Sequence, residues 1–301
     1  MTRDILLTPG PTPVPPEVLE LLSEPIYHHR TPRARGVLEE LTGRLQRIFR
    51  TENMVLTLTC SGTGAMETAV VNAAGPDAKA LTISGGKFGQ RWGKICKAHG
   101  IPYEEMEIEW GTAIQPEAVK AALDADPSIT MVCATFVETS TAVRHDIEAL
   151  GELTKNTDKL LLVDGISGVG ADPFETDAWG VDLLAVGSQK ALMMPPGLAY
   201  LAVSEKAWTK IDANPKRGFY FDLATYRKSM AKFDTPYTPA HTLIRAQNKA
   251  AEMILECGLE GVWKANAKKA AAIRATLLAL GIELFAESPS DAVTAFKVPE
   301  D

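Results

Sequence analysis

Two side chains with reactive groups stand directly after apolar runs of the sequence. Lys190 follows the run LLAVG at residues 183–187 and is flanked by small residues rather than by charges. A solvated surface lysine, the ordinary alternative, rarely has such neighbours. Burial lowers the pKa of a lysine, so a desolvated amine is available as a nucleophile toward aldehydes. Lys190 therefore predicts Schiff-base chemistry.

Asp164 ends a second apolar run, LLLV at residues 160–163. Ligands of open α/β sheets bind at the carboxyl ends of strands, so this aspartate indicates where a site lies. The alternative is a loop cap after a strand. A functional aspartate here requires a cationic partner, because a partly buried carboxylate is costly when it is unpaired.

A turn of small residues, CSGTGAME at 60–67, separates an apolar run from an apolar helical pattern. The N–H groups of a helix start and the hydroxyls of Ser61 and Thr63 would bind an anion there. A tight turn with Ser61 as helix N-cap is the alternative. The Walker A motif needs a Gly-Lys pair, and the dinucleotide motif needs a third glycine where Glu67 stands. What remains fits a single phosphate.

The lysine, the aspartate and the turn together are the parts that pyridoxal 5′-phosphate requires. They supply an amine for a Schiff base, a carboxylate for the pyridine nitrogen and a helix N-terminus for the phosphate. They also follow one another in the order in which successive strand ends would bring them. The sequence thus predicts a pyridoxal phosphate site and no metal site.

From about residue 54, short apolar runs alternate with helical patterns, which indicates β-α units around a mostly parallel sheet. We expect an α/β fold with seven strands, at residues 54–59, 79–83, 103–108, 129–136, 159–164, 182–186 and 198–203. We expect crossover helices at 63–74, 90–98, 116–125 and 146–154, and an amphipathic surface helix at 36–50.

The two ends of the chain differ from this pattern. The proline-rich residues 1–35 predict an extended arm with one short helix at 17–23, and such an arm usually lies across a partner subunit. Residues 36–255 would form the large domain. Beyond the sheet, residues 240–257 and 259–280 predict two long helices, and 281–286 and 293–298 predict two strands. We expect residues 256–301 to be the start of a smaller, incomplete C-terminal α/β domain.

Composition excludes several classes of protein. The 301 residues are 46% hydrophobic and 23% charged, with a formal net charge of −7, which is typical of a soluble globular protein. The acidic balance, without any basic run, argues against nucleic-acid and anionic-membrane surfaces. No apolar run approaches the roughly 20 residues that cross a bilayer, and there is no signal-peptide core. The four cysteines are widely separated, so we expect a cytoplasmic protein with reduced thiols.

Six segments match a known family in order along the chain. They are LLTPGPTP at 6–13, SGT at 61–63, FGQR at 88–91, ETST at 138–141, VD at 163–164 and GSQK at 187–190. These segments resemble the class-V aminotransferases of fold type I, most of all the serine–pyruvate and alanine–glyoxylate group. The resemblance implies a pyridoxal phosphate transaminase that moves the amino group of alanine or serine to glyoxylate or pyruvate.

The resemblance also implies roles for single residues. Lys190 would form the Schiff base and move a proton between the substrate Cα and the cofactor C4′, while Asp164 would pair with the pyridinium nitrogen. Phe88 would stack on the cofactor ring and Ile166 would pack on its opposite face, although a core position is the alternative for Phe88. Thr139 would hydrogen-bond the ring hydroxyl.

The implied phosphate contacts are Ser61, Gly62, Thr63 and Gln189. A neighbouring subunit would complete this site with Thr235 and Thr238, in the segment TPYTP at 235–239, so the resemblance implies a homodimer with shared active sites. Gly10 would lie close to the bound substrate. Relatives bind the substrate carboxylate with an arginine of the C-terminal domain, and no matching segment precedes Asp301, so we expect that arginine in a longer chain.

Three other functions remain open from the sequence. The same class contains aspartate and aminoethylphosphonate transaminases. A pyridoxal phosphate lyase such as a cysteine desulfurase would need a reactive cysteine on a loop, whereas Cys257 ends a predicted helix. Some relatives carry the name of a soluble hydrogenase subunit, a redox or binding role for which the sequence shows no iron–sulfur or nickel ligand cluster.

Overall fold

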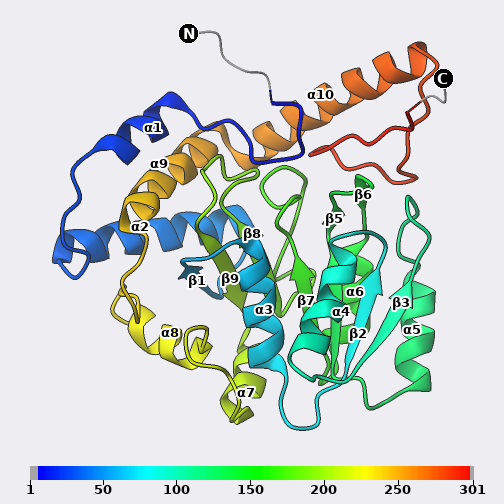
Figure 1. The fold of residues 1–301 in the computed structure, drawn as a ribbon, viewed down its shortest axis with the longest axis horizontal. Coiled ribbons are helices and arrows are strands. Elements are labelled where there is room, and N and C mark those ends of the chain that lie inside the picture. The colour runs from blue at the N-terminus through cyan, green and yellow to red at the C-terminus, as the bar shows by residue number, and fades with distance from the viewer. Residues whose placement is uncertain (1–5, 299–301) are drawn as a thin grey trace.

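The computed structural model, which describes residues 6–298, is built around a seven-stranded sheet (Figure 1). Its strands are β1 (Met54–Leu58), β2 (Ala80–Ser84), β3 (Tyr103–Glu107), β4 (Met131–Thr135), β7 (Leu160–Asp164), β8 (Leu183–Gly187) and β9 (Ala199–Val203). They lie in the order β1-β9-β8-β7-β4-β2-β3. Each of the seven expected strands is present.

Strand directions confirm the expected mostly parallel α/β sheet. Five neighbouring strands, β8 to β3 in this order, pair in parallel. Only β9 runs against its two neighbours, with Met54 opposite Val203 on β1 and Leu183 opposite Val203 on β8. The carboxyl ends of the other six strands therefore meet at one edge of the sheet.

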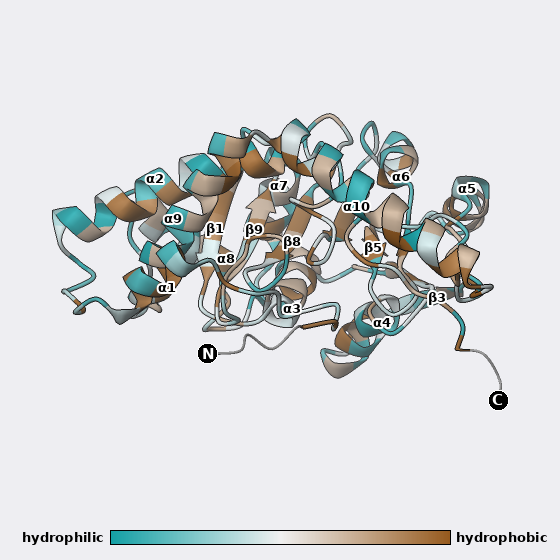
Figure 2. Ribbon diagram, turned by 90° about the horizontal axis from the view of Figure 1, so that it is seen from above, coloured by the Kyte–Doolittle hydropathy of each residue, from teal (hydrophilic) through white to brown (hydrophobic). Residues whose placement is uncertain are grey.

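Helices cover both faces of the sheet, as expected for strands that are buried on both sides. Helices α3 (Gly62–Ala73) and α4 (Gly89–Ala98) lie on one face. Helices α2 (Pro32–Phe49), α5 (Pro116–Ala125) and α6 (Ile147–Thr154) lie on the other (Figure 2). Five of the strands between them, β2, β4, β7, β8 and β9, are buried along their whole length, whereas the edge strand β3 carries three glutamates. No helix among residues 6–298 is long and apolar enough to span a membrane.

The N-terminal segment differs in part from the expected arm. Residues 1–5 lie outside the described residues, and α1 (Pro16–Ser23) forms where a short helix was expected. Helix α2 begins at Pro32 rather than at residue 36, because the Thr31 side chain accepts a hydrogen bond from the Ala34 N–H and a proline is favoured in the first helical turn.

The C-terminal segment contains the two expected helices, α9 (His241–Cys257) and α10 (Leu259–Ala279). The two expected strands at 281–286 and 293–298 are wrong: one isolated bridge, between Leu284 and Phe296, joins these segments. Two backbone hydrogen bonds flank this bridge, from the Phe285 N–H to the Ala295 carbonyl and from the Lys297 N–H to the Glu283 carbonyl. Beyond them the backbone bonds elsewhere, since the Glu287 N–H donates to the carbonyl of Gly111. Residues 299–301 lie outside the described residues.

Four short elements were not expected from the sequence. They are β5 (Val137–Glu138), β6 (Val143–Arg144), α7 (Glu205–Ala213) and α8 (Leu223–Met230). Two-residue strands carry no periodicity, and each of the two helices buries only three residues. Each helix begins at a side-chain cap, Ser204 for α7 and Asp222 for α8.

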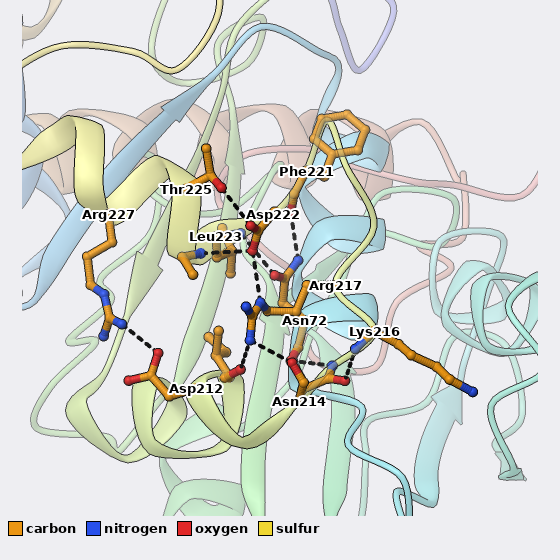
Figure 3. A network of polar contacts seen from close by, with 12 residues as sticks. Asn72, Asp212, Asn214, Lys216, Arg217, Phe221, Asp222, Leu223, Thr225 and Arg227 are labelled. Atoms are coloured by element: carbon orange, nitrogen blue, oxygen red, sulfur yellow. Dashed lines mark hydrogen bonds and ion pairs between the residues drawn. The ribbon is translucent and has the colours of Figure 1, made fainter.

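A polar network holds the connection between α7 and α8 against helix α3 (Figure 3). The side chain of Asn72 donates to the carbonyl of Phe221 (2.7 Å) and accepts from the N–H of Leu223 (2.9 Å). Arg217 donates to the Asp222 carboxylate at 2.9 Å. Asn72 is fully buried, so its amide satisfies backbone groups that have no access to water.

We expect Asn72→Ala to lower the free energy of unfolding by about 2–4 kcal/mol, because two buried backbone groups lose their partner. Urea unfolding followed by circular dichroism measures this loss. Asp212→Asn is the matched control, since Asp212 belongs to an exposed ion pair with Arg227 beside the same network. We expect this control to change stability by less than about 0.5 kcal/mol. Equal losses of unfolding free energy in the two variants would contradict the stabilising role of the Asn72 amide.

Candidate active site

A cavity of about 260 Å³ lies at the edge of the sheet where the parallel strands end. Nine residues expected from the sequence line it: Gly10, Ser61, Gly62, Thr63, Phe88, Asp164, Ile166, Gln189 and Lys190. They follow β1, β2, β7 and β8 or belong to the N-terminal segment. Parallel pairing thus brings together groups that are up to 180 positions apart in the sequence.

A larger cavity, of about 710 Å³, contains none of these residues. It lies beside the C-terminal end of α2 and the junction of α9 and α10, where Arg50 pairs with Glu175 and Glu260. No lysine, cysteine or histidine lines it. Volume alone therefore does not locate the reactive groups.

Lys190 lies just beyond β8 with its amine in the cavity. The Nζ donates a hydrogen bond to the carbonyl of Pro9 (2.7 Å). Burial lowers the pKa of Lys190, and the nearby Asp164 opposes this effect. A larger share of the amine is therefore neutral, and thus nucleophilic, than for a lysine in water.

The N-terminal segment covers this lysine closely. The Thr12 N–H donates to the carbonyl of Gln189 (3.0 Å), and the Thr12 hydroxyl donates to the carbonyl of Lys190 (2.9 Å). A Cβ at Gly10 would lie 2.6 Å from Lys190 Nζ, and the φ of Gly10 is +138°. Only glycine permits this approach and this backbone conformation.

Asp164 is the last residue of β7 and is 3% exposed. One carboxylate oxygen accepts from the Ile166 N–H at 2.9 Å. The pKa of Asp164 is raised to about 7, chiefly by burial; the Ile166 N–H, Arg91 and Lys190 oppose this rise, whereas Glu138 contributes to it. A buried carboxyl group that faces a cavity without a paired cation fits a protonated ring nitrogen as its partner.

The turn after β1 has the geometry of an anion site. Helix α3 begins at Gly62, and Ser61 occupies the N-cap position but makes no side-chain cap bond, so its hydroxyl is available. The first N–H groups of a helix have no partner within the helix. A Cβ at Gly62 would collide with the Ile166 side chain. These features fit a phosphate group, which takes hydrogen bonds from such donors.

Gln189 and Thr63 extend this polar wall. The Gln189 Oε1 atom is buried and has no hydrogen-bond partner among the described residues. The Thr63 hydroxyl accepts from Arg91 Nη1 at 2.9 Å. Because an amide oxygen only accepts hydrogen bonds, it is the N–H₂ group of Gln189 that would donate to a phosphate. The residues present therefore fit a phosphorylated pyridine such as pyridoxal phosphate.

Besides Pro11, which follows Gly10, three further residues line the cavity and were not expected. The Arg91 guanidinium lies over the Phe88 ring, 4.7 Å from its centroid. Ser167 and Pro196 complete the wall. The helical spacing from Phe88 to Arg91 could have indicated the first contact, whereas nothing in the sequence marks the other two.

Thr139 does not line the cavity directly. Its hydroxyl lies 2.5 Å from the hydroxyl of Ser167, which does line it. The structure thus places Thr139 behind Ser167. Its contact with a ring hydroxyl stays a prediction.

Thr235 and Thr238 lie outside the cavity of their own chain. Thr235 is buried, and its hydroxyl donates to the carbonyl of Tyr237 at 2.7 Å, whereas Thr238 is exposed. Their expected contribution to a neighbouring subunit stays a prediction.

Comparison with protein families gives one match over almost the whole chain. Residues 5–300 match the family model described as Aminotransferase class-V. An uncharacterized aminotransferase of Methanocaldococcus jannaschii is 43% identical over 99% of this chain and 78% of that protein. The small subunit of a soluble hydrogenase of Synechococcus is 38% identical over 97% of this chain and 78% of that protein.

Two relatives have names that include substrates. An L-aspartate–glyoxylate aminotransferase of Paracoccus denitrificans is 35% identical over 99% of this chain and 78% of that protein. A serine–glyoxylate aminotransferase of Methylorubrum extorquens is 33% identical over 99% of this chain and 77% of that protein.

Solved structures with the same fold carry similar names. An aspartate aminotransferase from Thermus thermophilus superposes with a TM-score of 0.92 at 35% identity, covering 99% of this chain and 83% of that one. An alanine–glyoxylate aminotransferase from Nostoc superposes with a TM-score of 0.94 at 27% identity, covering 100% of this chain and 83% of that one.

Proposed function

The chain belongs to the class-V aminotransferases, a pyridoxal phosphate-dependent family, and we propose that it transfers the amino group of a small amino acid to a short 2-oxo acid through Lys190. The observation that carries this proposal is a single cavity that holds a partly buried amine, a buried carboxyl group and a helix N-terminus. The carboxyl group ends β7 and the amine lies just beyond the neighbouring parallel strand β8, while the helix start follows β1, which is separated from β8 by β9.

Each wall of the cavity has a part in holding the cofactor. Ser61, Gly62, Thr63 and Gln189 would bind its phosphate, and Phe88 and Ile166 would contact its ring. Thr139 would hydrogen-bond the ring hydroxyl, and Asp164 would pair with the ring nitrogen. When bound, pyridoxal phosphate supplies an electron sink that stabilises negative charge at the substrate Cα.

Lys190 has two tasks in this proposal. It would hold the cofactor covalently, and its amine would move a proton between the substrate Cα and C4′. The lowered pKa of Lys190 suits the second task, because a neutral amine is the form that accepts a proton. The cover of Pro9 and Gly10 restricts the access of water to this amine.

We propose glyoxylate or pyruvate as the acceptor and alanine or serine as the donor. Relatives named for aspartate–glyoxylate and serine–glyoxylate transfer support glyoxylate and make aspartate the main alternative donor. Aminoethylphosphonate is a further alternative within the class. Separate half-reactions of the loaded enzyme with alanine, serine, aspartate and aminoethylphosphonate, followed by cofactor absorption, test the donor. Conversion of the cofactor by aspartate alone would contradict the proposal that alanine or serine is the donor.

Two other activities need their own tests. A lyase would release a product from cysteine without consuming a 2-oxo acid, and Cys257 is exposed just at the end of α9. The hydrogenase relative makes a redox role the second candidate. Hydrogen-dependent dye reduction that survives Lys190→Ala would favour that role over transamination.

The proposal extends to assembly and cell compartment. The enzyme would be a homodimer in which Thr235 and Thr238 complete the phosphate site of the neighbouring subunit. Residues 1–35 would form an arm, 36–255 the large domain and 256–301 part of the small domain. The four unpaired cysteines support a reducing compartment, the cytoplasm.

A further inference from the structure

Glu138 is a buried carboxylate that no assigned role explains. It is 1% exposed and forms no ion pair within residues 6–298. Burial of a carboxylate without compensation is costly, so its surroundings must satisfy it with hydrogen bonds.

Four donors from two different loops bind this carboxylate. Oε2 accepts from the N–H groups of Phe88 (3.0 Å) and Gly89 (2.8 Å), at the start of α4. Oε1 accepts from the N–H (3.1 Å) and the hydroxyl (2.6 Å) of Ser140. Hydrogen bonds to an ionised acceptor are about twice as strong as neutral ones, and a helix start favours negative charge.

Glu138 and its hydrogen-bond partners lie in the two segments that follow the adjacent strands β2 and β4. After β2 the chain enters α4 on one face of the sheet, and after β4 it goes on to α6 on the opposite face (Figure 2). Connections that leave adjacent strands on opposite faces open the crevice in which α/β proteins bind ligands. Since β2 and β4 are adjacent, Glu138 ties together the two walls of this crevice.

The absence of a side chain at Gly86 leaves space for the Glu138 carboxylate. A Cβ at Gly86 would lie 2.5 Å from Glu138 Cδ and 2.6 Å from the Ser140 hydroxyl. The turn after β2 therefore needs glycine here if it is to receive the glutamate. On the other side of Phe88, Arg91 lies over the ring. The Phe88 backbone and ring are thus each held by a charged side chain.

We propose that Glu138 is a positioning residue that holds Phe88 and the Thr139 loop in the geometry that binds the cofactor. The inference rests on the proposed function, because it assigns both residues to the cofactor. Glu138 touches neither cofactor nor substrate in this account. It acts through the N–H groups of Phe88 and Gly89 on one wall and through the loop that carries Thr139 on the other.

The experiment compares Glu138→Gln and Glu138→Asp with the wild type. Glutamine keeps the length of the side chain but presents an N–H₂ group to one pair of donors, and aspartate keeps the charge but is too short to reach both loops. We expect both to raise the dissociation constant of pyridoxal phosphate by roughly 10–100-fold, as loss of charged hydrogen bonds does. Glu107→Gln, an exposed carboxylate of β3, is the control that should leave it unchanged.

Two readouts separate positioning from a general loss of structure. Hydrogen–deuterium exchange on the cofactor-free protein should show faster exchange of the Phe88 and Gly89 amides in both variants than in wild type. In a double-mutant cycle with Phe88→Ala, Glu138→Gln should weaken cofactor binding by less than it does alone, because the part of its effect that passes through the Phe88 ring is already lost.

The outcomes distinguish the two proposals. Unchanged cofactor affinity in both Glu138 variants, or full additivity with Phe88→Ala, would overturn the positioning role. A wild-type protein that binds no cofactor would overturn the proposed function instead. In that case the exchange of the Phe88 and Gly89 amides still decides whether Glu138 holds this wall.

Discussion

The Lys190→Ala protein is expected to fold normally and to transfer amino groups at least roughly 10²–10⁴ times more slowly than wild type. This is the contribution of a positioned proton-transfer group alone. The variant lacks the amine that holds the cofactor covalently and takes the Cα proton. Its fold should persist, because Lys190 is only partly buried and makes one side-chain hydrogen bond, to Pro9. Single-turnover kinetics with a donor amino acid measure the loss.

The matched control for this variant is Lys120→Ala, which removes an exposed lysine of α5 that pairs with Asp124. We expect wild-type rates from it. Activity of Lys190→Ala within tenfold of wild type, with the fold verified by circular dichroism, would show that another group carries the chemistry.

Asp164→Asn is expected to have opposite effects on activity and on the stability of the cofactor-free protein. Without the carboxylate, a protonated ring nitrogen loses its buried counter-charge. Breaking a buried pair costs about 3–5 kcal/mol, so activity should fall by roughly 10²–10³-fold. Asparagine, in contrast, needs no desolvation of a charge, so the cofactor-free variant should be more stable than wild type at alkaline pH.

The stability effect has a defined pH window. The pKa of Asp164 is raised from 3.8 to about 7, chiefly by burial, so between these values the folded wild type binds a proton that the unfolded chain has released. Its stability therefore falls as the pH rises from about 4 to about 7, and the full cost is present above pH 7. The asparagine side chain of the variant does not titrate, so its advantage should grow over this window to on the order of 2–4 kcal/mol.

Melting temperatures of the cofactor-free proteins at pH 5.5 and pH 8.5 check this prediction. Asp158→Asn, which changes an exposed aspartate before β7, serves as control and should be neutral at both values. A gain of equal size at the two pH values would show that the Asp164 carboxyl does not titrate as its surroundings indicate.

The sheet could be predicted from the sequence because its central strands are buried on both faces. Continuous apolar runs such as residues 160–163 and 183–186 are typical of strands that helices cover on both faces. Their ends could also be located, because Asp164 and Lys190 interrupt apolar or small neighbours. The order of strands in the sheet then brings the two residues to one edge, which explains why so much of the cavity lining was expected.

What could not be predicted depends on contacts between distant segments. Glu138 lies in a segment that resembles the family, but its bonds to Phe88 and Gly89 exist only because β2 and β4 are neighbours. The strands expected at the C-terminus are joined by one isolated bridge, because the backbone just beyond it, at Glu287, bonds to the distant Gly111 instead. Neither the hydrogen bonds of Glu138 nor the limited pairing at the C-terminus can be predicted from the local sequence pattern.

The central claim, a Lys190-dependent transaminase, is tested most directly by the absorption spectrum of the protein loaded with pyridoxal phosphate. We predict a visible band from the covalently held cofactor, which alanine or serine converts to the spectrum of the amine form and glyoxylate or pyruvate restores. The Lys190→Ala protein should show neither the band of the wild type nor its cycle. A wild-type protein that binds no cofactor, or whose bound cofactor no amino acid converts, would contradict the account.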